Sequence, residues 1–167
     1  MLGLGAAIFA CLLVTTGFAK LRRPGDTSLA LAAIGFPNRR WLGTVIGAIE
    51  ITIGGSVLLL ASPIALLGQA LIYTSFSAWI GLALVRKVPI ASCGCLGTPD
   101  TPPYWGHLVL DISATVASMA AALTITGPLL QGTGAENAVA ALLIGIGTYL
   151  AWLVIGDGAR LKGAYSA

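Results

Sequence analysis

Five long apolar segments leave few folds open to this chain. They occupy residues 2–19, 41–61, 64–85, 108–126 and 138–156. A helix needs about 20 apolar residues to cross the hydrocarbon core of a bilayer, and each segment supplies close to that number. Apolar residues make up 57% of the 167 and charged residues only 9%, with a mean hydropathy of +0.93, which exceeds what water-soluble domains use. We therefore expect an all-α fold: a polytopic transmembrane helix bundle with a four-helix core and a fifth, C-terminal span.

The stretches between these segments are too short to form a soluble domain. We expect residues 1–167 to form a single integral membrane domain. A short apolar piece at residues 28–36 cannot span a bilayer, so we expect it to lie in the interface or to pack under the bundle.

The basic residues predict how the bundle is oriented. No positive charge precedes the first apolar segment, which favours a retained helix with its N-terminus outside over a cleaved signal peptide. All nine basic residues then fall on one side of the membrane, as the positive-inside rule requires of a cytoplasmic face. They are Lys20, Arg22, Arg23, Arg39, Arg40, Arg86, Lys87, Arg160 and Lys162. A net charge of +3 requires no nucleic-acid partner; the expected surroundings are the lipid bilayer.

The second span carries small residues and a carboxyl group on one helical face. Gly43, Gly47, Glu50 and Gly54 recur at steps of four, three and four, so Glu50 is expected to point into the bundle, near the middle of the bilayer. An ionisable residue at that depth is a functional candidate by default.

A polar stripe is predicted to continue through the bundle interior. Its members recur at helical spacing in two further spans: Gln69, Tyr73 and Ser77 in the third, and Asp111, Thr115, Ser118 and Ala122 in the fourth. Such residues hold helices together in many membrane proteins, and this structural role is the alternative to a chemical one. Lys20 is placed to pair with either Glu50 or Asp111, which would explain the charges without chemistry.

Two of the three cysteines, Cys93 and Cys95, lie one residue apart between the third and fourth spans. Gly94 permits the backbone kink that a disulfide at this spacing needs. So small a ring is strained and readily reduced, which favours a redox switch over a structural crosslink. His107 follows at the membrane boundary and either tunes a thiol or relays a proton, or is only a polar cap. Cys11 is expected to be a small, buried, apolar residue that does not meet the other two.

Two other functions stay open from the residues alone. Two thiols and one imidazole can bind Zn or Cu(I), although zinc sites usually separate their cysteines by at least two residues. Alternatively, the chain is a non-catalytic accessory or scaffold subunit that docks a larger membrane complex, and its cysteines are incidental.

These residues resemble the MauE proteins of methylamine utilisation and the wider DoxX-like membrane proteins. The similarity covers roughly residues 3–125. It rests on Phe18-Ala19-Lys20-Leu21, on Gly35-Phe36-Pro37, on Glu50 followed by Gly54, and on Cys93-Gly94-Cys95-Leu96-Gly97 ahead of Pro103 and His107. Leu96 stands where the family more often has Phe, and the fifth apolar segment lies beyond the four-helix core that the family suggests.

The resemblance implies a helical bundle in the bacterial inner membrane that supports thiol and disulfide chemistry during the maturation of an exported protein. The implied partner is a thioredoxin-like or disulfide-containing protein. We therefore predict a thiol-disulfide oxidoreductase in which Cys93 and Cys95 exchange electrons with a partner, and Glu50, Asp111 and His107 carry protons.

Cofactor and orientation are the open parts of this hypothesis. The residues define no certain cofactor; a resemblance of architecture to quinone-linked thiol oxidases makes a quinone the candidate. Disulfide supply to exported proteins belongs on the outer face, whereas the charges put the segment with Cys93 and Cys95 on the cytoplasmic side. We follow the charges, because inverting the chain would leave nine basic residues outside.

Overall fold

The computed structural model describes residues 2–86, 104–124 and 133–165, with side chains described for 3–86, 104–124 and 133–154. Within these ranges the chain is helical and contains no strand. The helices are α1 (Leu2–Arg22), α2 (Pro24–Ala32), α3 (Arg40–Leu60), α4 (Pro63–Val85), α5 (Trp105–Thr124) and α6 (Gly134–Tyr165). The expected all-α class is confirmed.

Five of the helices are long and apolar enough to cross a membrane. Their candidate spans are Gly3–Arg22, Arg40–Leu60, Pro63–Val85, Trp105–Thr124 and Gly134–Val154. Each coincides with one of the five segments predicted from the sequence, so this is a multi-pass membrane protein. The fourth span begins at Trp105 rather than at residue 108, because the aromatic and imidazole side chains lower the local hydropathy without interrupting the helix.

The short apolar piece predicted at residues 28–36 forms most of α2 and the turn that follows. Pro24 occupies the first turn of the helix, where its missing N–H costs nothing, and Gly35 adopts φ +103° where the chain turns away. Ala30 packs against Ala83 of α4. Of the two placements predicted for this piece, the structure shows the one in which it packs against the bundle.

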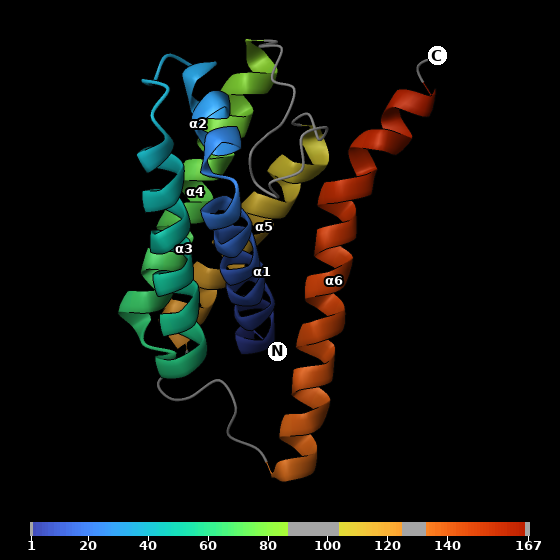
Figure 1. Ribbon diagram of the computed structural model, residues 1–167. Helices are drawn as coiled ribbons and strands as arrows, with labels where there is room; N and C mark the ends of the chain where they lie inside the picture. Colours follow the sequence, from blue (N-terminus) through green and yellow to red (C-terminus); the bar gives the residue numbers. More distant parts are fainter. Residues whose placement is uncertain (1, 87–103, 125–132, 166–167) are drawn as a thin grey trace.

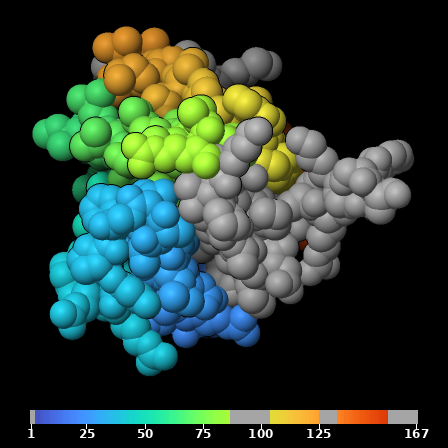
Figure 2. Space-filling model, turned by 90° about the horizontal axis from the view of Figure 1, so that it is seen from above, coloured from blue at the N-terminus to red at the C-terminus, as the bar shows by residue number. Residues whose placement is uncertain are grey.

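α1 lies at the centre of the bundle (Figure 1). It packs along α3 on one side and along α5 and α6 on others, while α4 packs mainly against α5. α1, α4 and α6 finish at the same end of the bundle at which α3 and α5 begin. We call this the basic end, because the basic residues of the described segments lie in or next to the helix ends found there: Lys20, Arg22, Arg23, Arg39, Arg40 and Arg86. Seen from above this end, α2 lies beside the end of α4 (Figure 2).

Glycines bring α1 and α3 into backbone contact. A Cβ on Gly17 would lie 2.7 Å from the carbonyl oxygen of Gly47, and a Cβ on Gly47 would lie 2.8 Å from that of Gly17. A Cβ on Gly54 would likewise lie 2.8 Å from the carbonyl oxygen of Ala10. This confirms the predicted glycine face of the second span, and it lets buried polar side chains of the two helices meet at short range.

Candidate functional site

A buried ion pair joins α1 to α3. The ammonium Nζ of Lys20 lies 2.8 Å from Oε1 of Glu50 and donates a hydrogen bond to Oε2 at 3.0 Å. Both side chains are almost wholly buried, at 3% and 1% exposure. Lys20 therefore pairs with Glu50, one of the two partners predicted for it, instead of extending to the surface.

Two further side chains contact the pair directly. Thr16 Oγ1 donates to Glu50 Oε2 at 3.2 Å, and Lys20 Nζ lies 5.3 Å from the centroid of the Phe76 ring, within cation–π range. The glycine contacts between α1 and α3 place this arrangement at the closest approach of the two helices, since a Cβ on Gly47 would lie 3.1 Å from Lys20 Cβ. The two opposite charges cancel, so the site is neutral as a unit.

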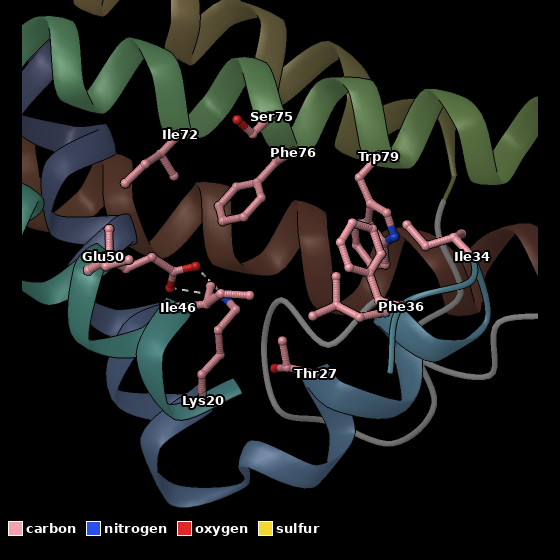
Figure 3. A pocket seen from close by; sticks show the side chains of 12 residues that line it. Lys20, Thr27, Ile34, Phe36, Ile46, Glu50, Ile72, Ser75, Phe76 and Trp79 are labelled. Atoms are coloured by element: carbon pink, nitrogen blue, oxygen red, sulfur yellow. Dashed lines mark hydrogen bonds and ion pairs between the residues drawn. The ribbon is translucent and has the colours of Figure 1, made fainter. Parts of the chain in front are cut away.

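A cavity of about 430 Å³ opens beside the ion pair (Figure 3). Lys20 and Glu50 form one end of it. The rest of its wall comes from α2, the turn after it, α3 and α4: Thr27 and Leu31 of α2, Ile34 and Phe36 after it, Ile46 and Ile49 of α3, and Ile72, Ser75, Phe76 and Trp79 of α4. A mostly apolar cavity with a few polar groups at defined places is the usual form of a small-molecule site.

A second, uncharged polar cluster lies on the other side of α1. Gln69 Nε2 of α4 donates to the carbonyl oxygen of Ala6 at 3.0 Å and to Ser118 Oγ of α5 at 2.9 Å. Nearer the basic end, the Tyr73 hydroxyl donates to the carbonyl oxygen of Phe9 at 2.7 Å. These contacts join three helices through neutral hydrogen bonds, as predicted for the polar stripe.

His107 and Asp111 lie one turn apart in α5, and both are buried. The ring of Tyr104 packs against the His107 ring with centroids 4.5 Å apart, and the Tyr104 hydroxyl donates to the carbonyl oxygen of Val154 in α6. Burial raises the pKa of Tyr104, which keeps this hydroxyl a donor. His107 is thus an interior residue of the bundle rather than a surface cap.

The predicted site residues fall into separate places. Cys93 and Cys95 lie outside the described residues. Glu50 sits on α3, whereas His107 and Asp111 sit on α5, and these two helices share no extensive contact because α1 lies between them. The roles predicted for the five residues stay predictions, but Glu50 belongs to a different neighbourhood from the other two described residues.

Cys11 is half-buried between α1 and α6. It lines a second cavity of about 400 Å³ together with Thr148 and Trp152, and it is a free thiol. Thr148 of α6 donates a hydrogen bond to the carbonyl oxygen of Ile8 in α1 at 3.3 Å, which joins the two helices. Cys11 is therefore less buried than expected, because its side chain borders this cavity rather than a closed helix contact.

The cavity beside Lys20 and Glu50 is the feature that sequence reasoning missed. It depends on α2 folding back against α4, a tertiary contact with no periodic signal of its own. Two aromatic residues in α4, Phe76 and Trp79, recur three positions apart and hence on one face. That spacing is the one sequence signal we find for an aromatic face of α4 that could line a cavity.

Fold and site together define a multi-pass helical membrane protein with a buried ion pair beside an apolar cavity. The chain belongs to the MauE family: residues 1–127, about three quarters of it, match the model of the family described as methylamine utilisation protein MauE. The match ends before α6 begins at Gly134. Searches of curated proteins and of solved structures found no match to this chain.

Proposed function

We propose that this protein is a membrane-embedded thiol–disulfide redox protein that exchanges electrons with a partner protein through Cys93 and Cys95. The observation that carries the proposal is the pairing of these two thiols, within the part of the chain that matches the MauE family, with a buried imidazole at the start of the next helix. The family's name connects it with methylamine utilisation, and we extend that connection to this chain.

The chain's connectivity supports a role for the basic end. Arg86 and Tyr104, the described residues on either side of the segment that holds the thiols, both lie there. Basic residues concentrate on the cytoplasmic side of membrane proteins. We infer that the basic end faces the cytoplasm of a bacterial cell, and that the partner, a thioredoxin-like or other disulfide-containing protein, approaches from that side.

The chemistry requires two thiols and two proton transfers. The thiolate of one cysteine attacks the partner's disulfide, which forms a mixed disulfide and releases one partner thiolate. The second cysteine attacks the mixed disulfide, which releases the other partner thiolate and leaves a disulfide between Cys93 and Cys95. The partner gains two electrons, this chain loses two, and the protons of its two thiols end on the partner; the reverse sequence oxidises the partner.

We assign the proton transfers to His107 and Asp111. They are buried one turn apart on α5, the helix that follows the thiols in the chain, and imidazole titrates near neutral pH. Glu50 was predicted to share this role. Because Lys20 and Thr16 hold its carboxylate on another helix, we assign it to the ion pair instead.

The direct test is the redox state of the two thiols in membranes. Reversible oxidation of Cys93 and Cys95, scored by alkylation with a mass-tagged thiol reagent, and a trapped mixed disulfide in a Cys95→Ser or Cys93→Ser variant are the expected results. Cys11→Ser is the matched control, since that thiol lies between α1 and α6, and it should change neither.

The same experiment separates the redox protein from an accessory subunit or a metal carrier. Thiols that stay reduced under oxidising conditions, with normal complex formation by the double Cys93→Ser, Cys95→Ser variant, would refute the redox proposal in favour of a scaffold. Stoichiometric Zn or Cu(I) bound to the reduced protein and lost in that variant would refute it in favour of metal handling.

A further inference from the structure

The cavity beside the ion pair opens towards the lipid. Ile49 of α3 and Ser75 of α4 line it and are exposed on the outer surface of the bundle. Ile49 lies nine residues beyond Arg40, or about 13 Å along the helix from the basic end, so this part of the wall lies at hydrocarbon depth. A ligand therefore enters most directly from the bilayer, which selects lipid-soluble molecules.

The charges on the wall select an uncharged ligand. Lys20 and Glu50 neutralise each other at 2.8 Å, and the other lining residues carry no charge. A ligand with its own net charge would be buried without a counterion, at a high cost in free energy. A neutral molecule with polar atoms can instead lie against the ion pair and keep it intact.

The remaining wall favours a flat ring with hydrogen-bond acceptors. Phe36, Phe76 and Trp79 contribute three aromatic rings, and ring-to-ring packing is more favourable than area alone suggests. The indole nitrogen of Trp79 is buried and has no hydrogen-bond partner among the described residues. Figure 3 shows Trp79 and Glu50 at opposite ends of the cavity, with Phe76 between them.

We propose that the cavity between α2, α3 and α4 binds a lipid-soluble quinone, with one carbonyl oxygen towards the Lys20–Glu50 pair and the other accepting from the indole N–H of Trp79. A quinone ring is flat and uncharged and carries two acceptor oxygens on opposite sides, which matches the two polar ends and the aromatic wall. The volume of about 430 Å³ lies within the range of small-molecule sites. This proposal concerns binding alone and stands whether or not Cys93 and Cys95 exchange electrons.

A pair of serine variants tests the site. Ser75 and Ser113 are both exposed, and each donates a 2.8 Å hydrogen bond to the carbonyl oxygen four residues earlier, at Leu71 and Val109. Only Ser75 lines the cavity. Ser75→Phe fills the cavity mouth, whereas Ser113→Phe adds the same ring to a lipid-facing surface of α5.

The measurement is equilibrium binding of decylubiquinone to the purified full-length protein in nanodiscs, followed by quenching of tryptophan fluorescence. We expect saturable quenching for the native chain and for Ser113→Phe, and a dissociation constant raised about tenfold or more in Ser75→Phe, because the added ring occupies the ligand's space. Quenching that never saturates, or that responds equally to both substitutions, would overturn the proposal.

Two further arms keep the test decisive if Ser75→Phe does not fold. Trp79→Phe retains an aromatic ring but removes the indole N–H donor. It should weaken quinone binding, measured by retention of radiolabelled quinone. Trp105→Phe, the control, should leave that binding unchanged. Decylbenzene, which has the ring and chain but no oxygens, should fail to compete with the quinone. Competition at similar concentrations would show an unspecific lipid pocket and refute recognition of a quinone.

Discussion

α1 uses charges on one of its sides and neutral hydrogen bonds on another. Towards α3 it offers Lys20, whose ammonium pairs with Glu50 at 2.8 Å. Towards α4 and α5 it offers backbone carbonyl groups, and Gln69 and Tyr73 donate to them at 3.0 and 2.7 Å. Both sets of contacts are buried, yet they differ in what their loss would leave behind. A broken ion pair leaves a charge in a medium of low dielectric constant, whereas a lost neutral bond leaves one polar group that finds other partners more easily.

This difference also separates packing from binding. A neutral hydrogen bond between helices is a sufficient reason for Gln69 and Tyr73 to be where they are. An ion pair holds helices together less efficiently, because burying two charges has a large desolvation cost. Well-packed apolar residues often replace buried pairs without loss of stability. Its position at one end of an apolar cavity supplies a second reason for its presence, which is the recognition of a ligand.

Breaking the ion pair should have the largest effect. Lys20→Met keeps the length of the side chain but leaves Glu50 without its counterion, and we expect it to lower the free energy of unfolding by about 3 to 5 kcal/mol. The measurement is a titration with SDS in mixed micelles, followed by circular dichroism. The double variant Lys20→Met, Glu50→Gln removes both charges and should recover at least half of the loss. Equal instability of both variants would show that the helices need the ammonium for packing and not for charge pairing.

A side chain at the closest approach of α1 and α3 should have the next largest effect. A Cβ at Gly47 would lie 2.8 Å from the carbonyl oxygen of Gly17, so Gly47→Val must push the helices apart and should cost about 2 kcal/mol. Gly55→Val is the matched control on the same helix, since a Cβ there meets nothing within 4 Å. The same SDS titration measures both. A control as unstable as Gly47→Val would mean that helix propensity, and not helix contact, sets the cost.

The neutral cluster should be more tolerant. Gln69→Leu replaces the amide by an apolar group of similar size and removes the hydrogen bonds to Ala6 and Ser118. We expect a loss of about 1 to 1.5 kcal/mol in the same titration, because the substitution removes two interhelical hydrogen bonds and each is worth about 0.6 kcal/mol on average in a membrane. A loss as large as that of Lys20→Met would erase the distinction between the two sides of α1.

Much of the fold was predictable because a bilayer admits few solutions. The five spans follow from hydropathy, and the glycine face of α3 follows from steps of three and four residues, which hold for any helix. The pairing of Lys20 was predicted only as a choice between Glu50 and Asp111. The choice depends on which helices are neighbours, and the glycine contacts of α3 with α1 decide it.

The cavity could not be predicted, because it is made by the placement of α2. The sequence signals that residues 28–36 are apolar and too short to span, but not which helix they pack against. The contact between Ala30 and Ala83 brings Thr27, Leu31 and Ile34 opposite the aromatic face of α4. The prediction that Glu50, Asp111 and His107 act together rested on two carboxyl groups inside the spans and on an imidazole that follows the thiols at the membrane boundary. These properties do not determine which helix faces which.

The smallest effect should come from the hydroxyl of Tyr73. Tyr73→Phe removes the hydrogen bond to the carbonyl oxygen of Phe9 but keeps the edge-to-face packing against the rings of Phe9 and Phe76, at centroid distances of 5.8 and 6.2 Å. We expect a loss of about 0.6 kcal/mol in the SDS titration, because the Phe9 carbonyl retains its place in the helix ladder. Tyr149→Phe, at a tyrosine that is 61% exposed on α6, should leave the stability unchanged. If Tyr73→Phe instead cost more than Gln69→Leu, the hydrogen bond of Tyr73 would be the stronger of the two, and the main neutral contact of α1 would lie at Phe9 rather than one turn further from the basic end, at Ala6.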